Sequence, residues 1–404
     1  DHAQYELAML DFEAASYQQV QIRLAAMKNL DLVSALQVQL DLLAARTSAV
    51  LRERDAAESS YLAALSLARS SQLLDLEQEV LFYLIAFYGR EDVAGEPNLE
   101  MEKCLPYYDA FFQKFADSAY APQVASVAMP ALKLAGELQR GIDTLQLVLQ
   151  SASSASKEAG VRNAARTLIW AKIDSGIKLS ELKLEFEAHP PSRFALVQWF
   201  ALAEVYAAGL EQAHLTWGRK LRYDAILRSI YAELSLRAKT VELPAYIDLA
   251  LADWYLTDEN FPHLARGHFE SALESELIGQ RMLASLGLAK SLRISATLPD
   301  LQHAQRILSE LLERTQDDMP LLEKSMCESI EVLSQLESWD ILTERAKSYL
   351  IENKFDYQRS RVWYLLAKSY DLRGLSEDAM ANYSRVFAGY TRVLAVSAPS
   401  VARL

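Results

Sequence analysis

WYLLAKSYDLRGLSEDAMANYSRV, residues 363–386, is the stretch that decides the fold. Its apolar residues recur at three- and four-residue spacing on both sides of Gly374, which is the pattern of two amphipathic helices joined by a turn. The small residues Ala367 and Ala379 allow the two helices to approach closely, and the aromatic residues around them fill the remaining space. The stretch therefore predicts a hairpin of packed α-helices.

The same pattern occurs along most of the chain. Trp199 to Tyr206 repeats the spacing W-x2-L-A-x2-Y, and Trp363 lies 363 − 199 = 164 positions later, which corresponds to four units of about 41 residues. Weaker copies occupy 251–272, 288–311 and 329–349, and looser ones occupy 84–111, 124–150 and 161–188. A single helical pair cannot bury its apolar side alone, so we expect stacked pairs to share one continuous core.

These motifs resemble the tetratricopeptide repeat, whose first helix carries W-x2-L-G/A-x2-Y and whose second helix carries A-x3-F/Y-x2-A. The resemblance covers residues 31–394. It implies an all-α fold, an α-α superhelix (TPR-like solenoid) of about nine helix pairs, preceded by a leading helix near 4–28. It also implies a non-catalytic scaffold that binds a protein or peptide partner on its concave face. We expect two lobes, 1–190 and 191–404, because proline interrupts the helices at Pro190-Pro191; Pro244 is the second candidate for the break.

The composition and the motifs argue against several classes of function. The chain has 404 residues, 51% of them hydrophobic, and a formal net charge of −13, which argues against nucleic acid as the partner. No phosphate loop, G-x-S-x-G or H-E-x-x-H motif is present, and His263 and His268 are five positions apart. We therefore predict no catalytic residue, no metal site and no cofactor. Cys104 and Cys327 are 327 − 104 = 223 positions apart, which argues against a disulfide in an elongated array.

Residues 107–125, YYDAFFQKFADSAYAPQVA, resemble the F-x3-(F/Y)-P-D-S-x-Y-A-x2-A joint of tetratricopeptide proteins in Gram-negative envelopes, such as the lipoprotein of the β-barrel assembly machine. Ala116 stands where that family has proline. We expect Asp117 and Ser118 to cap the following helix, and Tyr120 to pack back on the aromatic end of the preceding one. The resemblance implies a periplasmic or membrane-associated place in a bacterial cell envelope, with the cytoplasm as the alternative.

The start of the chain and its hydropathy bear on the same question. The sequence begins with Asp1 rather than methionine, so we expect a processed mature chain or an excised fragment. It has no run of 18 uncharged apolar residues that would span a membrane. An excised fragment leaves open a further interpretation, in which the chain is the helical regulatory part of a larger enzyme or signalling protein.

Fixed positions on the first helix of each pair line the binding groove of the tetratricopeptide family. Carried over to this sequence, the resemblance implies these partner-binding candidates: Arg361, Tyr364, Lys368, Asp371, Tyr246, Asp253, Lys290, Arg293, Phe200 and Glu204. Lys368 stands where a carboxylate-clamp adaptor needs asparagine, so that subclass is disfavoured. The mixture of aromatic and charged residues suits a helix or an extended peptide. The alternative is that several of these side chains pack against the next pair.

Residues 213–240 carry six basic and two acidic residues, a local charge of +4 in an acidic chain. If helical throughout, this segment is roughly 42 Å long. One interpretation is a long packing helix whose charges are solvated. The other is a basic ridge for an anionic polymer or a membrane surface, formed by Arg219, Lys220, Arg222 and Arg228.

Overall fold

The computed structural model describes residues 2–27, 32–89, 100–151, 158–188, 192–210, 217–241, 243–257, 259–351 and 358–388. Within these ranges all regular secondary structure is helical, and no strand occurs. The prediction of an all-α fold is confirmed. The chain forms two compact units, Asp1–Val241 and Glu242–Leu404, which are described separately.

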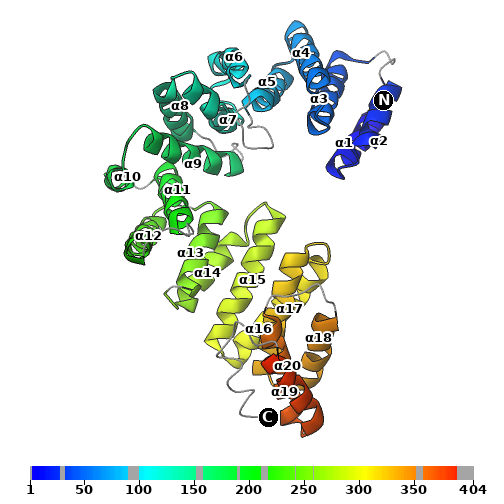
Figure 1. Ribbon diagram of the computed structural model, residues 1–404, viewed down its shortest axis with the longest axis vertical. Helices are drawn as coiled ribbons and strands as arrows, with labels where there is room; N and C mark the ends of the chain where they lie inside the picture. The colour runs from blue at the N-terminus through cyan, green and yellow to red at the C-terminus, as the bar shows by residue number, and fades with distance from the viewer. Residues whose placement is uncertain are drawn as a thin grey trace. The chain divides into compact units, whose positions relative to one another are not determined.

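Unit 1 contains twelve α-helices and one short 3-10 helix, η1, among its described residues (Figure 1). Their bounds are α1 His2–Glu13, α2 Tyr17–Met27, α3 Ser34–Val50, α4 Arg54–Ser70, α5 Leu74–Gly89, η1 Met101–Cys104, α6 Leu105–Phe115, α7 Ala121–Leu134, α8 Leu138–Ser151, α9 Glu158–Asp174, α10 Leu179–Glu187, α11 Arg193–Leu210 and α12 Trp217–Ala238.

Unit 2 contains eight α-helices among its described residues. Their bounds are α13 Ala245–Thr257, α14 Pro262–Ala272, α15 Ile278–Ser295, α16 Leu298–Arg314, α17 Met319–Gln335, α18 Trp339–Ile351, α19 Arg359–Leu372 and α20 Ser376–Ala388. Proline and a capping side chain mark two of the starts: Thr297 accepts a hydrogen bond from the backbone N–H of Asp300 before α16, and Asp318 accepts one from Leu321 before α17.

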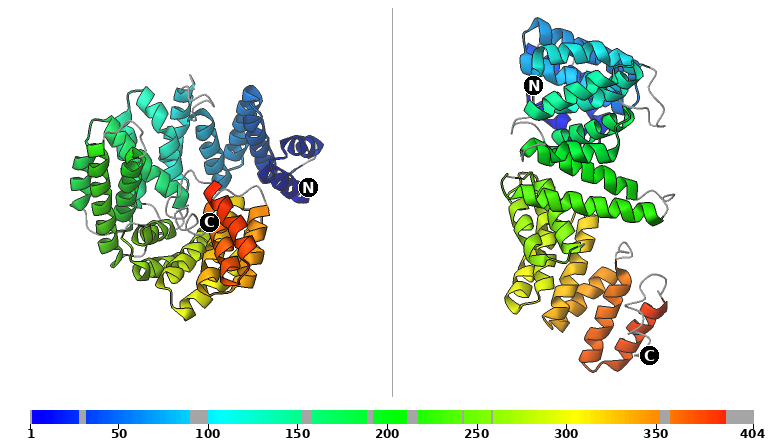
Figure 2. Two further views of the ribbon diagram at one scale, coloured as in Figure 1. Left: turned by 60° about the horizontal axis from the view of Figure 1, so that its bottom comes forward. Right: turned by 90° about the vertical axis from the view of Figure 1, so that its left-hand side faces the viewer.

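From α3 onward the helices form nine pairs, each with an odd-numbered first helix and an even-numbered second helix, among the described parts of the chain. Most first helices pack both on their own second helix and on the next first helix, as α7 does on α8 and α9, and α15 on α16 and α17. The same stacking order is visible within each unit in Figures 1 and 2. This is the arrangement of a tetratricopeptide-like helical repeat, and it confirms the predicted fold class.

The start of the chain differs from the prediction. The expected single helix near 4–28 is two helices, α1 and α2, which pack against each other. The break comes at Ala15, which has a left-handed backbone with φ of 56°. That conformation terminates α1, although alanine, unlike glycine, pays a steric penalty for it.

The two units meet between Val241 and Glu242, beside Pro244. The expected lobes, 1–190 and 191–404, placed the division earlier. The first helices α9 and α11, which precede and follow position 190 in the sequence, pack against each other, so both belong to unit 1.

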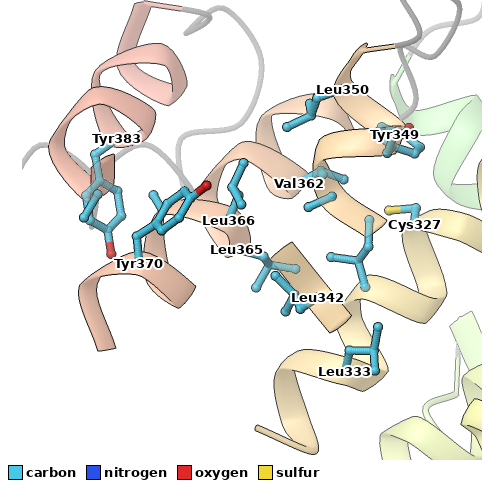
Figure 3. Close-up of a cluster of buried hydrophobic side chains, with 14 residues drawn as sticks. Cys327, Leu333, Leu342, Tyr349, Leu350, Val362, Leu365, Leu366, Tyr370 and Tyr383 are labelled. Atoms are coloured by element: carbon cyan, nitrogen blue, oxygen red, sulfur yellow. The ribbon is translucent and has the colours of Figure 1, made fainter. Parts of the chain in front are cut away.

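The repeat motifs form the cores of the units. In the last two pairs of unit 2, Leu342, Ala346 and Tyr349 of α18 are fully buried, and Ala379 and Tyr383 of α20 are nearly so. Figure 3 shows the aliphatic side chains of α17, α18 and α19 pointing toward one another, with the rings of Tyr370 and Tyr383 beside them. The equivalent small and aromatic positions of α14, α16 and α11 are buried as well. The small residues therefore lie where the helices approach most closely.

The two tryptophan motifs lie in similar surroundings. Trp199 of α11 lies under the guanidinium of Arg237 from α12, whose Cζ is 5.5 Å from the ring centroid. Trp363 of α19 lies under Arg385 from α20 at 4.6 Å. In both pairs a tryptophan of the first helix thus stacks on an arginine of the second. Trp363 is only partly buried, because it belongs to the last described pair.

Candidate functional site

The first helices of unit 2 leave one side uncovered by the described chain, and we call this side the front face of the unit. On α17 it is the side of Lys324 and Glu331. It is opposite Ser329, whose hydroxyl contacts Gln305 of α16 and Arg345 of α18. The front face is therefore turned away from the second helices.

Each first helix of unit 2 has two residues seven positions apart on this side, and all of them except the buried Tyr246 are at least partly exposed. Seven residues are close to two full turns, so both members of a pair point the same way. The four pairs, from α13 to α19, are Tyr246 and Asp253, Leu283 and Lys290, Lys324 and Glu331, and Arg361 and Lys368. Five of the ten predicted groove residues are among these eight.

Two predicted arginines are held by the neighbouring first helix. Arg361 of α19 donates two hydrogen bonds to Glu331 of α17, at 2.5 and 3.1 Å, and Arg293 of α15 pairs with Glu328 of α17. The hydrogen bond to Glu331 raises the pKa of the Arg361 guanidinium. These pairs hold successive first helices together. A role of Arg361 and Arg293 in partner binding stays a prediction.

The other candidates on α19 contact the second helices α18 and α20. Tyr364 lies 6.1 Å from the ring of Tyr383, and the Tyr383 hydroxyl donates to Asp371 at 3.5 Å. The Lys368 ammonium lies 5.9 Å above the ring of Trp339. Lys368 therefore lies at the edge of the front face, where its ammonium contacts the aromatic ring at the start of the second helix α18.

The two candidates on α13 differ in exposure. Tyr246 is buried, with 7% of its surface exposed, whereas Asp253 is exposed. The opposite side of α13 carries Asp248, a buried carboxylate that lies 2.7 Å from His268 and accepts a hydrogen bond from Ser271 of α14 at 2.9 Å. This polar cluster holds α13 on α14, and no motif in the sequence indicated it.

The candidates of unit 1 lie at the contact between α9 and α11. Arg162 of α9 donates to Glu204 at 3.1 Å through Nε and lies 5.4 Å from the centroid of the Phe200 ring. Arg166, one turn further, has its Nε 3.9 Å from Glu204. Phe200 is buried and Glu204 is partly buried. Phe200 and Glu204 therefore pack between neighbouring repeats, which is the alternative given above to a role in partner binding.

One uncovered stripe was missed by the sequence analysis. Asn163, Arg166 and Trp170 are exposed along the side of α9 opposite Lys172, which bonds to Glu185 of α10. The Trp170 side chain is 45% exposed, which is unusual for so large an apolar residue. We call this stripe the front face of α9. The signal in the sequence was the spacing i, i+3, i+7 with two polar residues, which marks a solvent side rather than a core side.

The predicted basic ridge is described only in part. Residues 213–216 and the side chains of Arg219, Lys220 and Arg222 lie outside the described residues. The helix itself, α12, has 22 residues and is about 33 Å long, shorter than the expected 28 residues. Arg228 pairs with Asp224 at 3.1 Å on the same helix. At Arg228 the structure thus shows a paired surface charge.

The segment 107–125 forms the end of α6 and the start of α7. Pro122 occupies the first turn of α7, but that helix has no side-chain cap, so the predicted capping by Asp117 and Ser118 is wrong. The Ser118 hydroxyl instead accepts from the backbone N–H of Tyr120 at 3.1 Å and donates to Gln78 of α5 at 2.7 Å. Tyr120 stacks on Phe82 of α5 at 5.1 Å. This joint therefore docks on α5.

The described thiols and acidic residues form no reactive or metal-binding group. Both cysteines are buried, and burial raises the pKa of Cys104 to about 11 and that of Cys327 to about 12, so both are neutral thiols near pH 7. Among the described residues, no three His, Cys, Asp or Glu side chains gather as metal ligands. In the same part of the chain, no helix has the length and apolar character needed to cross a bilayer.

Comparison with known proteins adds the following. No protein-family model and no curated protein matches the sequence. Among solved structures, the APC/C hetero-tetramer Cut9–Hcn1 is 12% identical with a TM-score of 0.36, and the match covers 99% of this chain and 83% of that one. The tetratricopeptide-repeat domain of P58(IPK) is 12% identical with a TM-score of 0.28, covering 93% and 98%. At such scores the assignment of a tetratricopeptide-like helical repeat rests on the helices described above.

Proposed function

We propose that the chain is a non-catalytic scaffold that binds a partner protein on the front faces of its first helices. The observation that carries this proposal is the uncovered side of those helices. Their other sides are packed, while Trp170 and Lys324 are exposed and Lys290 and Lys368 are partly exposed. Within each unit, stacked first helices with an open side of aromatic and charged residues suit a peptide or helix laid across them.

The test compares two exposed apolar residues. Trp170 lies on the front face of α9, whereas Leu147, 62% exposed, lies on the second helix α8. The full chain, used as bait in a lysate of its source, is expected to lose its partner on Trp170→Ser and to keep it on Leu147→Ser. Equal recovery by the two variants, or equal loss, would contradict the proposal. Circular dichroism of both variants controls for folding.

We further propose a bacterial cell envelope as the place of this scaffold, with the cytoplasm as the alternative. Support comes from the resemblance of 107–125 to the joint of envelope tetratricopeptide proteins. Fractionation of source cells tests it: recovery with the periplasmic or membrane fraction is expected, and recovery with cytoplasmic markers alone would contradict it.

The alternative ligand, an anionic polymer or membrane surface on α12, stays a prediction. Its described part offers Arg228, which is paired with Asp224, and Arg237, which is buried on Trp199. The interpretation as a regulatory part of a larger enzyme or signalling protein likewise stays open as a prediction. The described contacts favour the front faces over both.

A further inference from the structure

We infer that the front face of unit 2 binds an extended, acidic polypeptide segment through Lys290, Lys324 and Lys368. This inference rests on the proposed scaffold function and names the chemistry of its partner. It depends on which cations of the face are already neutralised and on where the remaining ones lie.

The cations of the front face are of two kinds. Arg293 and Arg361 are neutralised by Glu328 and Glu331 of α17, as described above. The three lysines have no carboxylate within ion-pair distance in the described part of the chain, and Lys368 contacts only an aromatic ring. The arginines therefore hold the repeats together, while the lysines keep a positive charge that is available to an anionic partner.

The arginine–glutamate pairs also determine where the lysines lie along the axes of neighbouring helices. Lys290 precedes Arg293 by about one turn, and Lys324 precedes Glu328 by about one turn. Because Arg293 and Glu328 are paired, the two lysines lie at about the same level on neighbouring helices. Packed helices are about 8–10 Å apart, and an extended chain rises about 3.3 Å per residue. Acidic residues spaced by three positions match this separation.

Lys368 continues the row at a different height. It follows Arg361 by seven residues, or about 10 Å along α19, and reaches the level of Trp339 at the start of α18. The row therefore crosses α15, α17 and α19 obliquely. A segment that follows it needs on the order of nine to twelve extended residues.

The rest of the face favours a polypeptide over a denser polyanion. Leu283 and Ile294, 50% and 38% exposed, flank Lys290 on α15, so apolar side chains alternate with the lysines. The chain as a whole carries −13, which repels a polymer charged at every residue. Asp253 on α13 is exposed and repels an acidic segment, so the segment ends before α13. A polypeptide with an acidic residue at every third position and apolar residues between them fits both the charge of the lysines and the apolar side chains beside Lys290.

The inference is tested with a labelled peptide of five Glu-Leu-Ser repeats and the full chain, by fluorescence anisotropy. The acidic peptide is expected to bind, with an affinity about tenfold lower at 300 mM than at 50 mM salt. Peptides with Gln or Lys in place of Glu are expected to bind at least about tenfold more weakly. Each of Lys290→Glu, Lys324→Glu and Lys368→Glu is expected to weaken binding about 3- to 10-fold, and the triple variant to abolish it.

Arg306→Glu is the matched control, because Arg306 is exposed on the second helix α16 without an ion pair among the described residues. It reverses the same charge away from the front face and is expected to leave binding unchanged. Full binding by the triple lysine variant, an equal loss in Arg306→Glu, or equally tight binding of a 15-nucleotide oligothymidylate would overturn the inference.

The failure of this inference differs from the failure of the proposed function. A partner that is lost on Trp170→Ser but recovered in full by the triple lysine variant leaves the scaffold function standing and refutes the acidic segment. A partner retained by both variants refutes the scaffold function. Circular dichroism of the triple variant is the control for folding, since Lys324 is exposed but Lys290 and Lys368 are only partly exposed.

Discussion

The packing of α14 on α15 makes a sharp prediction for Gly287→Ala. A Cβ built at Gly287 would lie 2.1 Å from Cε1 and 2.2 Å from Cζ of Phe269, where carbon atoms normally keep about 3.5–4.0 Å. Phe269 is 3% exposed and belongs to the buried core of unit 2. Overpacking of this kind costs up to about 3 kcal/mol, and the better helix propensity of alanine returns about 1 kcal/mol. We expect a net loss of about 2 kcal/mol.

Gly267→Ala on the facing helix α14 is the matched control. Its Cβ would have no heavy atom within 4 Å, so only helix propensity acts, and stability should rise by about 0.5–1 kcal/mol. Urea unfolding followed by far-UV circular dichroism measures both variants. If Gly287→Ala were as stable as the unchanged chain, the close approach of α14 and α15 would be refuted. Phe269→Leu combined with Gly287→Ala should recover at least about 1 kcal/mol of coupling.

Three further predictions concern single groups. Glu331→Gln should lower stability by about 1 kcal/mol through the loss of the partly exposed pair with Arg361, and a double-mutant cycle should show the coupling shrink in high salt. Cys104 and Cys327 should resist Ellman's reagent at pH 8 until urea unfolds the chain. Burial raises their pKa values to about 11 and 12, so the folded chain holds the two thiol protons more tightly than the unfolded chain does. The free energy of unfolding that they contribute is therefore complete below the ordinary thiol pKa near 9 and is lost as the pH rises through the raised values. A urea midpoint that stays flat between pH 8.5 and pH 11 would contradict this. Asp248→Ala should cost about 1 kcal/mol, seen in the urea midpoint, because it removes the buried carboxylate that contacts both His268 and Ser271 of α14.

Much of the fold could be predicted because its signals are local. The small residues Ala367 and Ala379 and the glycine turn at Gly374 lie within one hairpin, and each sits where the spacing placed it. The break at Ala15 could not be predicted, because alanine rarely adopts a left-handed backbone and the sequence there contains no glycine or proline. The division of the chain depends on packing between repeats, which local spacing does not report.

The partners of the candidate residues could not be predicted, and their role in binding stays a prediction. Arg361 and Lys368 lie on the same side of α19, yet Arg361 is paired with Glu331 and Lys368 has no ion pair among the described residues. That difference depends on a carboxylate thirty residues earlier, which no motif includes. Trp170 was missed because an apolar residue at helical spacing is normally buried, and only its polar neighbours indicated a solvent side.

The stacking of hairpins has a mechanical consequence. Because each pair touches only its neighbours, pulling on the ends of unit 2 should detach the last hairpin, α19 and α20, without first breaking α13 from α14. Such a stack should lengthen in small successive steps at low force, each step releasing roughly one helical pair. A protein of this kind can yield under load and recoil when the load is removed.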